Sequence, residues 1–218
     1  MNVPKICLNM IVKNESTIII RLLESVTPLI DSYCICDTGS TDNTITLIQE
    51  YCESKNIPGK IIEESFRDFG YNRSYALKFC NDMKNADYIL LMDADMKLEI
   101  NTPDIQKFKN MLINDAYYVV QGCPNFYNEN IRIIRNDPTY HYWGVTHEYI
   151  ELPDNAVIEN ISKDILFIND INDGGCKENK FQRDVELLIK GLEANPNNPR
   201  YLFYLANSYR DSKQYEKA

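Results

Sequence analysis

The sequence predicts an α/β fold in which a mostly parallel sheet is flanked by helices, with a short helical extension at the C-terminus. In the first half of the chain, short apolar segments alternate with helix-like ones, as expected for strands joined by helices. Polar clusters follow three of the apolar segments, at residues 13–16, 37–42 and 93–95. Open parallel sheets bind ligands at the carboxyl ends of their strands. The sequence therefore predicts one ligand site at that edge.

The elements follow from apolar spacing and from the turn residues between them. In the first half, strands are expected at Ile6–Val12, Ser32–Cys36, Lys60–Ile62 and Tyr88–Met92, and helices at Thr17–Ile30, Asn43–Ser54 and Asn72–Met83. The pattern then changes to a helix over Asp104–Ile113 and strand-like segments at Ala116–Gln121, Asn130–Arg135 and Ile165–Ile168.

The last part of the chain reads as two helices, Arg183–Ala194 and Arg200–Ser212, separated by the Pro-rich break at 195–199. With 218 residues, the chain has room for one α/β domain and a small appendage. We therefore expect one domain over residues 1–178 and a helical extension over residues 179–218.

The amino-acid composition limits the classes of binding partner that the chain can have. The formal charge of −9 argues against a general nucleic-acid surface, which would be basic. The chain has seven cysteines; several lie in core-like apolar stretches and are expected to be reduced. No signal-like N-terminus and no apolar run approaching ~18 residues is present in the sequence. These features predict a cytoplasmic protein without a transmembrane segment, acting on a small partner.

Asp93 and Asp95 directly follow the most apolar predicted strand. Residues two apart on an extended segment point the same way, which suits a hard divalent cation, Mn²⁺ or Mg²⁺, bridging two phosphates. An Asp-x-Asp pair at an ordinary surface turn would be merely solvated. Its place at a strand end favours a cation site, because two adjacent carboxylates repel each other.

Asp37 ends the second predicted strand, and the residues after it, 38–44, open a helix. A glycine turn with a capping side chain explains residues 39–42 without any function. Asp37 itself lies at the strand tip, where its carboxylate can accept a hydrogen bond from the imide N–H of uracil or from a ribose hydroxyl.

The pair His147-Glu148 follows an aromatic stretch and a glycine, and it supplies an imidazole and a carboxylate side by side. A lone histidine is more often structural than ligating. Trp143 is either a stacking platform for a sugar or a buried aromatic plug. Arg132 and Arg135 alternate with apolar residues, which favours a half-buried edge strand, and a diphosphate contact is open for one of them.

Six motifs, in order along the chain, resemble those of family 2 glycosyltransferases with the GT-A fold, in the subgroup that carries tetratricopeptide-like repeats. They occur at Met10–Glu15, Asp37–Thr44, Asp68–Arg73, Leu91–Asp95, Gly144–Glu148 and Arg200–Asp211. Any one could arise by chance, but six in order span nearly the whole chain. The segment 167–175 departs from a histidine-containing pattern of the relatives, so a third metal ligand is missing or replaced.

The resemblance implies roles for particular residues. Donor-binding positions would be Ile11, Val12 and Glu15 at the nucleoside, Asp37 at the base, Arg73 at the base or diphosphate, and Asp93 and Ala94 at the donor. Asp95 and His147 would meet the metal. Glu148 would be the catalytic base of an inverting transfer, with Asp137 and Asp170 as competitors for that role.

The resulting expectation is a metal-dependent, hexosyltransferase-like enzyme that moves a sugar from a nucleotide-sugar, expected to be a UDP-sugar, to a glycan, protein or lipid-linked acceptor. A nucleotidyltransferase is the first alternative, but the Gly-rich N-terminal loop typical of that class does not appear near residues 10–16. A catalytically decayed domain on a repeat scaffold is the second alternative. The joint presence of Asp37, Asp93, Asp95, His147 and Glu148 argues against it.

Overall fold

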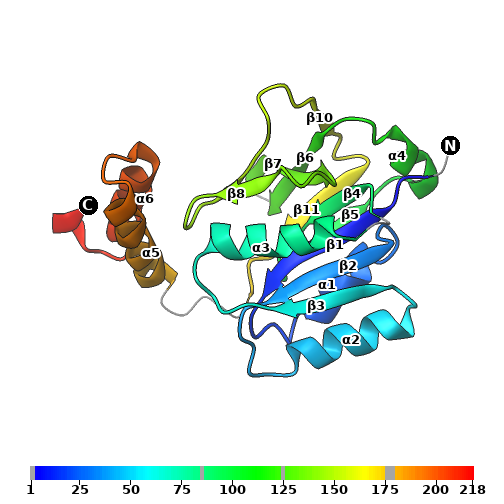
Figure 1. Ribbon diagram of the computed structural model, residues 1–218, viewed down its shortest axis with the longest axis horizontal. Coiled ribbons are helices and arrows are strands. Elements are labelled where there is room, and N and C mark those ends of the chain that lie inside the picture. The colour runs from blue at the N-terminus through cyan, green and yellow to red at the C-terminus, as the bar shows by residue number, and fades with distance from the viewer. Residues whose placement is uncertain (1–2, 84–85, 124–125, 175–179) are drawn as a thin grey trace.

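The computed structural model describes residues 3–83, 86–123, 126–174 and 180–218. It confirms an α/β fold: helices cover both faces of a central twisted sheet, and two further helices lie beyond one edge of it (Figure 1). In the described part of the chain, the sheet contains nine strands in the order β3-β2-β1-β4-β7-β6-β11-β5, with β10 paired to β6.

The parallel half of the sheet matches the prediction closely. Its strands are β3 (Gly59–Glu63), β2 (Ser32–Asp37), β1 (Ile6–Val12) and β4 (Tyr88–Leu91). In the register, Val12 pairs with Asp37 and Asn9 pairs with Leu91. The loops after β1, β2 and β4 therefore open at one edge, where the sequence placed the ligand site.

The other half of the sheet is mixed. Strands β6 (Ala116–Cys123) and β7 (Phe126–Arg135) form an antiparallel pair, and β7 runs antiparallel to β4. Strand β11 (Leu166–Asp170) is parallel to β6 and antiparallel to β5 (Met96–Ile100). The edge-strand interpretation of the segment with Arg132 and Arg135 is wrong, because β7 lies inside the sheet between β4 and β6.

Four strands were not expected from the sequence. Besides β5 they are β10 (Ile158–Ile161) and the short antiparallel pair β8 (His141–Trp143) and β9 (Tyr149–Glu151). Strand β5 alternates apolar and polar residues along its whole length, a strand signal that the prediction missed. Strands β8, β9 and β10 have only three or four residues, so their pairing partners decide their conformation.

Helices α1 (Ile19–Val26), α2 (Thr44–Ser54) and α4 (Ile105–Met111) bound one hydrophobic core, and α3 (Phe69–Asn81) bounds a second core with β8 and β9. Helix α3 begins three residues earlier than predicted. Asp68 caps it by accepting a hydrogen bond from the Tyr71 amide at 2.7 Å. The early start places Arg73 in the second turn, at the ligand edge.

The C-terminal helices α5 (Lys180–Ala194) and α6 (Pro199–Asp211) form a hairpin. Asn198 caps α6 by accepting from the amides of Arg200 and Tyr201. Proline at the first position of α6 has no N–H to satisfy, so the break at 195–199 is also a helix start. The expected boundary between residues 178 and 179 lies outside the described residues.

The six described cysteines are free thiols, and five of them are buried, as predicted for core positions. Helices long and apolar enough to span a membrane are not found in the described ranges.

Candidate functional site

A cavity of about 400 Å³ opens at the carboxyl edge of the parallel strands. The loops that follow β1, β2 and β4 contribute to its lining, together with the start of α3 and the segment after β11. Seven of the residues predicted to bind the donor or the metal line it: Ile11, Val12, Glu15, Arg73, Asp93, Ala94 and Asp95. The structure therefore brings together residues that are up to 84 positions apart in the sequence.

The loops after β1 and β2 hold each other in place. Asn14 has a φ of 56°, and its side-chain oxygen accepts a hydrogen bond from the Thr41 amide at 2.7 Å. The Glu15 amide donates to the Thr44 hydroxyl at 2.8 Å. Asparagine tolerates the left-handed region better than most residues, so Asn14 allows the chain to turn back across the strand ends.

Asp37 is buried beneath this loop pair. Its Oδ2 accepts hydrogen bonds from the amides of Gly39 and Ser40, both at 2.9 Å. Its Oδ1 is buried and has no hydrogen-bond partner among the described residues. The neighbouring Thr38 lines the cavity, whereas Asp37 does not itself form part of the lining. Oδ1 of Asp37 can therefore still accept a hydrogen bond, which is unusual for an oxygen of a buried carboxylate.

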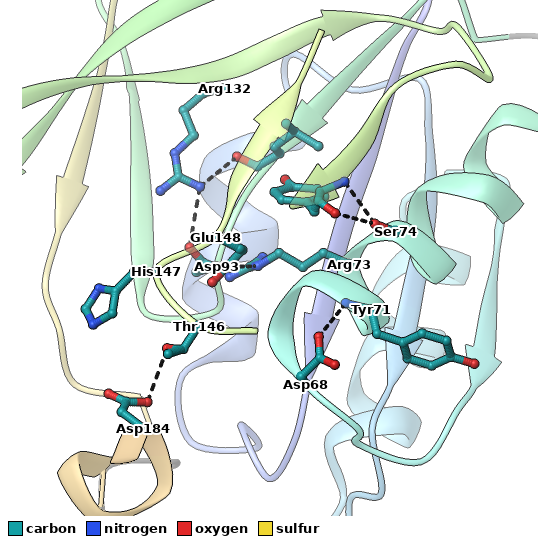
Figure 2. A network of polar contacts seen from close by, with 12 residues as sticks. Asp68, Tyr71, Arg73, Ser74, Asp93, Arg132, Thr146, His147, Glu148 and Asp184 are labelled. Carbon is teal, nitrogen blue, oxygen red and sulfur yellow. Dashed lines mark hydrogen bonds and ion pairs between the residues drawn. The ribbon is translucent and has the colours of Figure 1, made fainter. Parts of the chain in front are cut away.

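Asp93 lies at the centre of an ion-pair network (Figure 2). One carboxylate oxygen binds the Arg73 guanidinium, and the other lies 3.4 Å from Nη1 of Arg132. Nε of Arg73 donates to Glu148 Oε1 at 2.6 Å, and Nε of Arg132 donates to Gln121 at 2.7 Å. The Arg73 side chain is only 14% exposed, so it bridges two carboxylates in a largely dehydrated position.

The two arginines set the protonation state of Asp93. Burial alone would raise the pKa of this carboxyl, but the charges of Arg73 and Arg132 outweigh that effect and lower the pKa to about 2. Burial likewise disfavours the Arg73 cation, yet the carboxylates of Asp93 and Glu148 raise its pKa. Asp93 and Arg73 are therefore both charged at neutral pH.

A second cavity, of about 490 Å³, lies on the other side of this network. Arg73 and Asp93 line both cavities, whereas Glu148 lines only the second. The second cavity also has Tyr142 in its wall, and burial raises the pKa of its hydroxyl to about 12. Tyr142 thus stays protonated at neutral pH and can donate a hydrogen bond.

His147 points away from Asp93 and Glu148 (Figure 2). Its ring stacks on Tyr204 of α6 with centroids 4.0 Å apart, and its carbonyl accepts from Arg200 at 2.7 Å. Burial lowers the pKa of the imidazole. His147 is absent from the lining of both cavities. These contacts join the Gly144–Glu148 segment to the helical hairpin. The assignment of His147 as a metal ligand stays a prediction.

Asp95 lines the first cavity beneath the segment that follows β11. The Ile171 amide donates to the Asp95 carbonyl at 3.2 Å, and Asp170 and Gly174 also line the cavity. Within the described ranges, no three His, Cys, Asp or Glu residues are grouped so that they could hold an ion by themselves. Mg²⁺ and Mn²⁺ sites in transferases commonly use one or two carboxylates and complete the shell with substrate phosphates and water. Asp95, with Asp93 nearby, fits that kind of site.

Other candidates from the sequence lie elsewhere. The Asp137 carboxylate closes a turn by accepting from the amide and hydroxyl of Thr139, which lower its pKa; it lines neither cavity. Trp143 is half-buried, stacks on Tyr201 of α6 at 5.2 Å and lines neither cavity. Lys180 and Arg183 line the first cavity but were not predicted as site residues, because nothing local in a helical extension signals contact with a distant strand edge.

The chain is similar in sequence to known glycosyltransferases. The model of the family described as "Glycosyl transferase family 2" matches residues 7–169. The SPbeta prophage-derived glycosyltransferase SunS of Bacillus subtilis is 25% identical over 214 residues, covering 92% of this chain and 48% of that protein. An uncharacterized glycosyltransferase of Rickettsia felis is 29% identical over 100 residues, 46% of this chain and 32% of that protein. The chain spans about half the length of SunS.

Solved structures share the fold. S. aureus TarS 1–349 in complex with UDP has a TM-score of 0.56 at 15% identity, over 94% of this chain and 70% of that one. The mannosyltransferase PcManGT from Pyrobaculum calidifontis, in complex with GDP-Man and Mn²⁺, has a TM-score of 0.55 at 12% identity, over 96% and 70%. Because the family model covers most of the α/β region, the chain belongs to glycosyl transferase family 2.

Proposed function

We propose that this chain transfers a sugar from a nucleotide-activated donor to an acceptor, with inversion at the anomeric carbon. One observation carries the proposal: two cavities meet at Arg73 and Asp93, and a carboxylate, Glu148, faces the second cavity only. The first cavity suits the donor and the second an acceptor. The reacting atoms would then meet at the shared wall.

In this mechanism Glu148 accepts the proton of the acceptor's nucleophilic group. The nucleophile forms a bond to the anomeric carbon, and the bond from that carbon to the diphosphate oxygen breaks. Arg73 holds Glu148 through its Nε, which fixes the carboxylate at the wall between the two cavities. The leaving diphosphate departs into the first cavity.

A divalent cation, Mn²⁺ or Mg²⁺, would be held by Asp95 with Asp93 nearby and would supply charge stabilisation for the leaving diphosphate. The Mn²⁺ bound with GDP-Man in PcManGT supports this proposal. His147 as a further ligand requires its ring to leave the stack on Tyr204.

Cation and nucleoside diphosphate are therefore expected to bind cooperatively, because phosphate oxygens complete the coordination that Asp95 begins. Ligand at 100 times its Kd stabilises the folded state by about 2.7 kcal/mol, which corresponds to a rise of several degrees in Tm for a chain of this size. Thermal unfolding should show a larger UDP-induced rise with Mn²⁺ than with a chelator. Asp95→Ala should remove the difference, whereas Asp154→Asn, on an exposed loop, should retain it. Equal shifts with Mn²⁺ and with chelator would contradict the metal assignment.

The donor base is proposed to be uracil. Asp37 has one uncommitted acceptor oxygen, since Oδ2 already binds two amides. Uracil presents a single imide N–H, whereas guanine presents two neighbouring donors that call for both oxygens of a carboxylate. TarS binds UDP and UDP-GlcNAc, which supports the same preference.

Competition binding should therefore rank UDP above GDP. Asp37→Asn is expected to weaken UDP binding by about 10- to 100-fold, the loss of one charge-assisted hydrogen bond. The unfolding temperature of the apo variant checks that the turn at Gly39 and Ser40 has survived. GDP binding as tightly as UDP would refute the preference.

We also propose that residues 179–218 are a helical extension that resembles the start of a tetratricopeptide-like repeat. The paired helices α5 and α6 support this division. The acceptor is left open among glycans, proteins and lipid-linked molecules.

A further inference from the structure

The first turn of α5 reaches into the first cavity. Lys180 and Arg183 are three residues apart on this helix, so they lie on one face of it. Both line the cavity together with Asp93 and Asp95. The family match ends at residue 169, so these two cations come from a part of the chain outside the matched region.

Buried contacts hold α5 at this position. The Thr146 hydroxyl lies 3.3 Å from the Asp184 carboxylate, and both residues are buried. The Arg183 guanidinium lies over the Phe69 ring at 5.0 Å, with its Nε 3.8 Å from Asp184. Tyr201 of α6 accepts a hydrogen bond from the Val145 amide at 3.3 Å. The hairpin is thereby joined to the segment that carries Glu148 and to the start of α3.

The lining of the first cavity is rich in carboxylates, which would repel a bound diphosphate. Four carboxylates contribute to its lining: Glu15, Asp93, Asp95 and Asp170. Among the four cations of the lining, Arg73 is committed to Asp93 and Glu148. A nucleoside diphosphate adds further negative charge to this acidic setting. The other three cations of the lining are Lys13, in the loop after β1, and the pair on α5.

We propose that Lys180 and Arg183 bind the diphosphate of the nucleotide donor, so that the helical extension is part of the donor site. This inference rests on the proposed donor function of the first cavity. Arginine binds phosphate oxygens with two parallel N–H groups, and lysine acts as a mobile point charge. The extension thus confers affinity for the diphosphate, whereas the loops after β1 and β2 recognise the nucleoside.

Calorimetric titration with UDP, GDP and uridine tests this division. Lys180 is exposed, and solvent weakens the attraction between an exposed charge and a phosphate. Lys180→Ala should therefore reduce UDP affinity only ~2- to 5-fold. Arg183 is only 24% exposed in its side chain, and Arg183→Ala should cost about 10-fold. The double variant should lose ~20- to 50-fold for UDP, as the two effects combine, and the loss should shrink in high salt. Uridine, which lacks phosphate, should bind the double variant as it binds the wild type.

Lys190→Ala is the matched control, because Lys190 is an exposed lysine of the same helix and lies outside both cavities; it should bind UDP normally. Two results would overturn the assignment: unchanged affinity of the double variant for UDP and GDP, or an equal loss for uridine, which would mean that the substitutions act through the fold. If the wild-type protein binds neither UDP nor GDP, the donor site itself is wrong, and the role of α5 with it.

Discussion

Replacing Glu148 with glutamine is expected to lower the turnover number by ~10²–10⁴, the usual contribution of general-base catalysis, with donor binding nearly unchanged. Glutamine retains the size of the side chain and an oxygen that can accept from Arg73 Nε, 2.6 Å away in the native protein. It cannot take the acceptor's proton. Single-turnover measurements of sugar transfer at saturating donor, alongside calorimetric Kd values for UDP, separate the two effects.

Glu151→Gln is the matched control for this experiment. Glu151 lies in β9, three residues after Glu148, but it is exposed, pairs with His141 at 3.0 Å and lines neither cavity. Its replacement should leave turnover unchanged. Near-normal transfer by Glu148→Gln, with loss of activity in Asp170→Asn, would show that the general base is Asp170, in the first cavity. His147→Ala should instead weaken donor or metal binding if His147 is a ligand.

Replacing Asp93 with asparagine is expected to lower the free energy of unfolding by about 2–5 kcal/mol at pH 7. The lower value follows from the shift of its pKa from 3.8 to about 2, and the upper value is the cost of breaking a buried ion pair. The Asp93 side chain is 25% exposed, so solvent screens the pair only in part. Stabilities of folded domains are about 5–15 kcal/mol, which makes this a severe loss. Urea unfolding measures it.

The same substitution should change the pH dependence of stability. Because the folded state lowers the pKa of Asp93, its stabilising contribution is complete above about pH 4 and is lost as the pH falls towards 2. The difference between wild type and Asp93→Asn should therefore be constant from pH 7 to about 4.5 and shrink below pH 4. Asp211→Asn breaks an exposed pair with Arg210 and should cost less than about 1 kcal/mol. A pH-independent difference for Asp93→Asn would show that its charge is not what stabilises the fold.

The sequence by itself determined the parallel half of the sheet and the edge that carries the site. Strand β1 was predicted with its observed bounds, and β2, β3 and β4 to within one residue at either end. Asp93, Asp95 and Asp37 were predicted as site residues because each lies at or just after the end of a strongly apolar strand. Those signals are local: periodicity, turn residues and a carboxylate at a strand end need no knowledge of distant partners.

Only the tertiary structure decided the rest. Strands β8, β9 and β10, of three or four residues, are too short to show a period, whereas the alternation along β5 was present in the sequence and was missed. Strand β7 is an interior strand because β4 and β6 pair with its two sides. Arg73 bridges Asp93 and Glu148, which are 55 residues apart, and α5 brings two cations to a cavity built mainly by the first hundred residues. Ion pairs and cavity walls between such distant segments depend on how the whole chain packs, and packing leaves no periodic trace in the residues that it brings together.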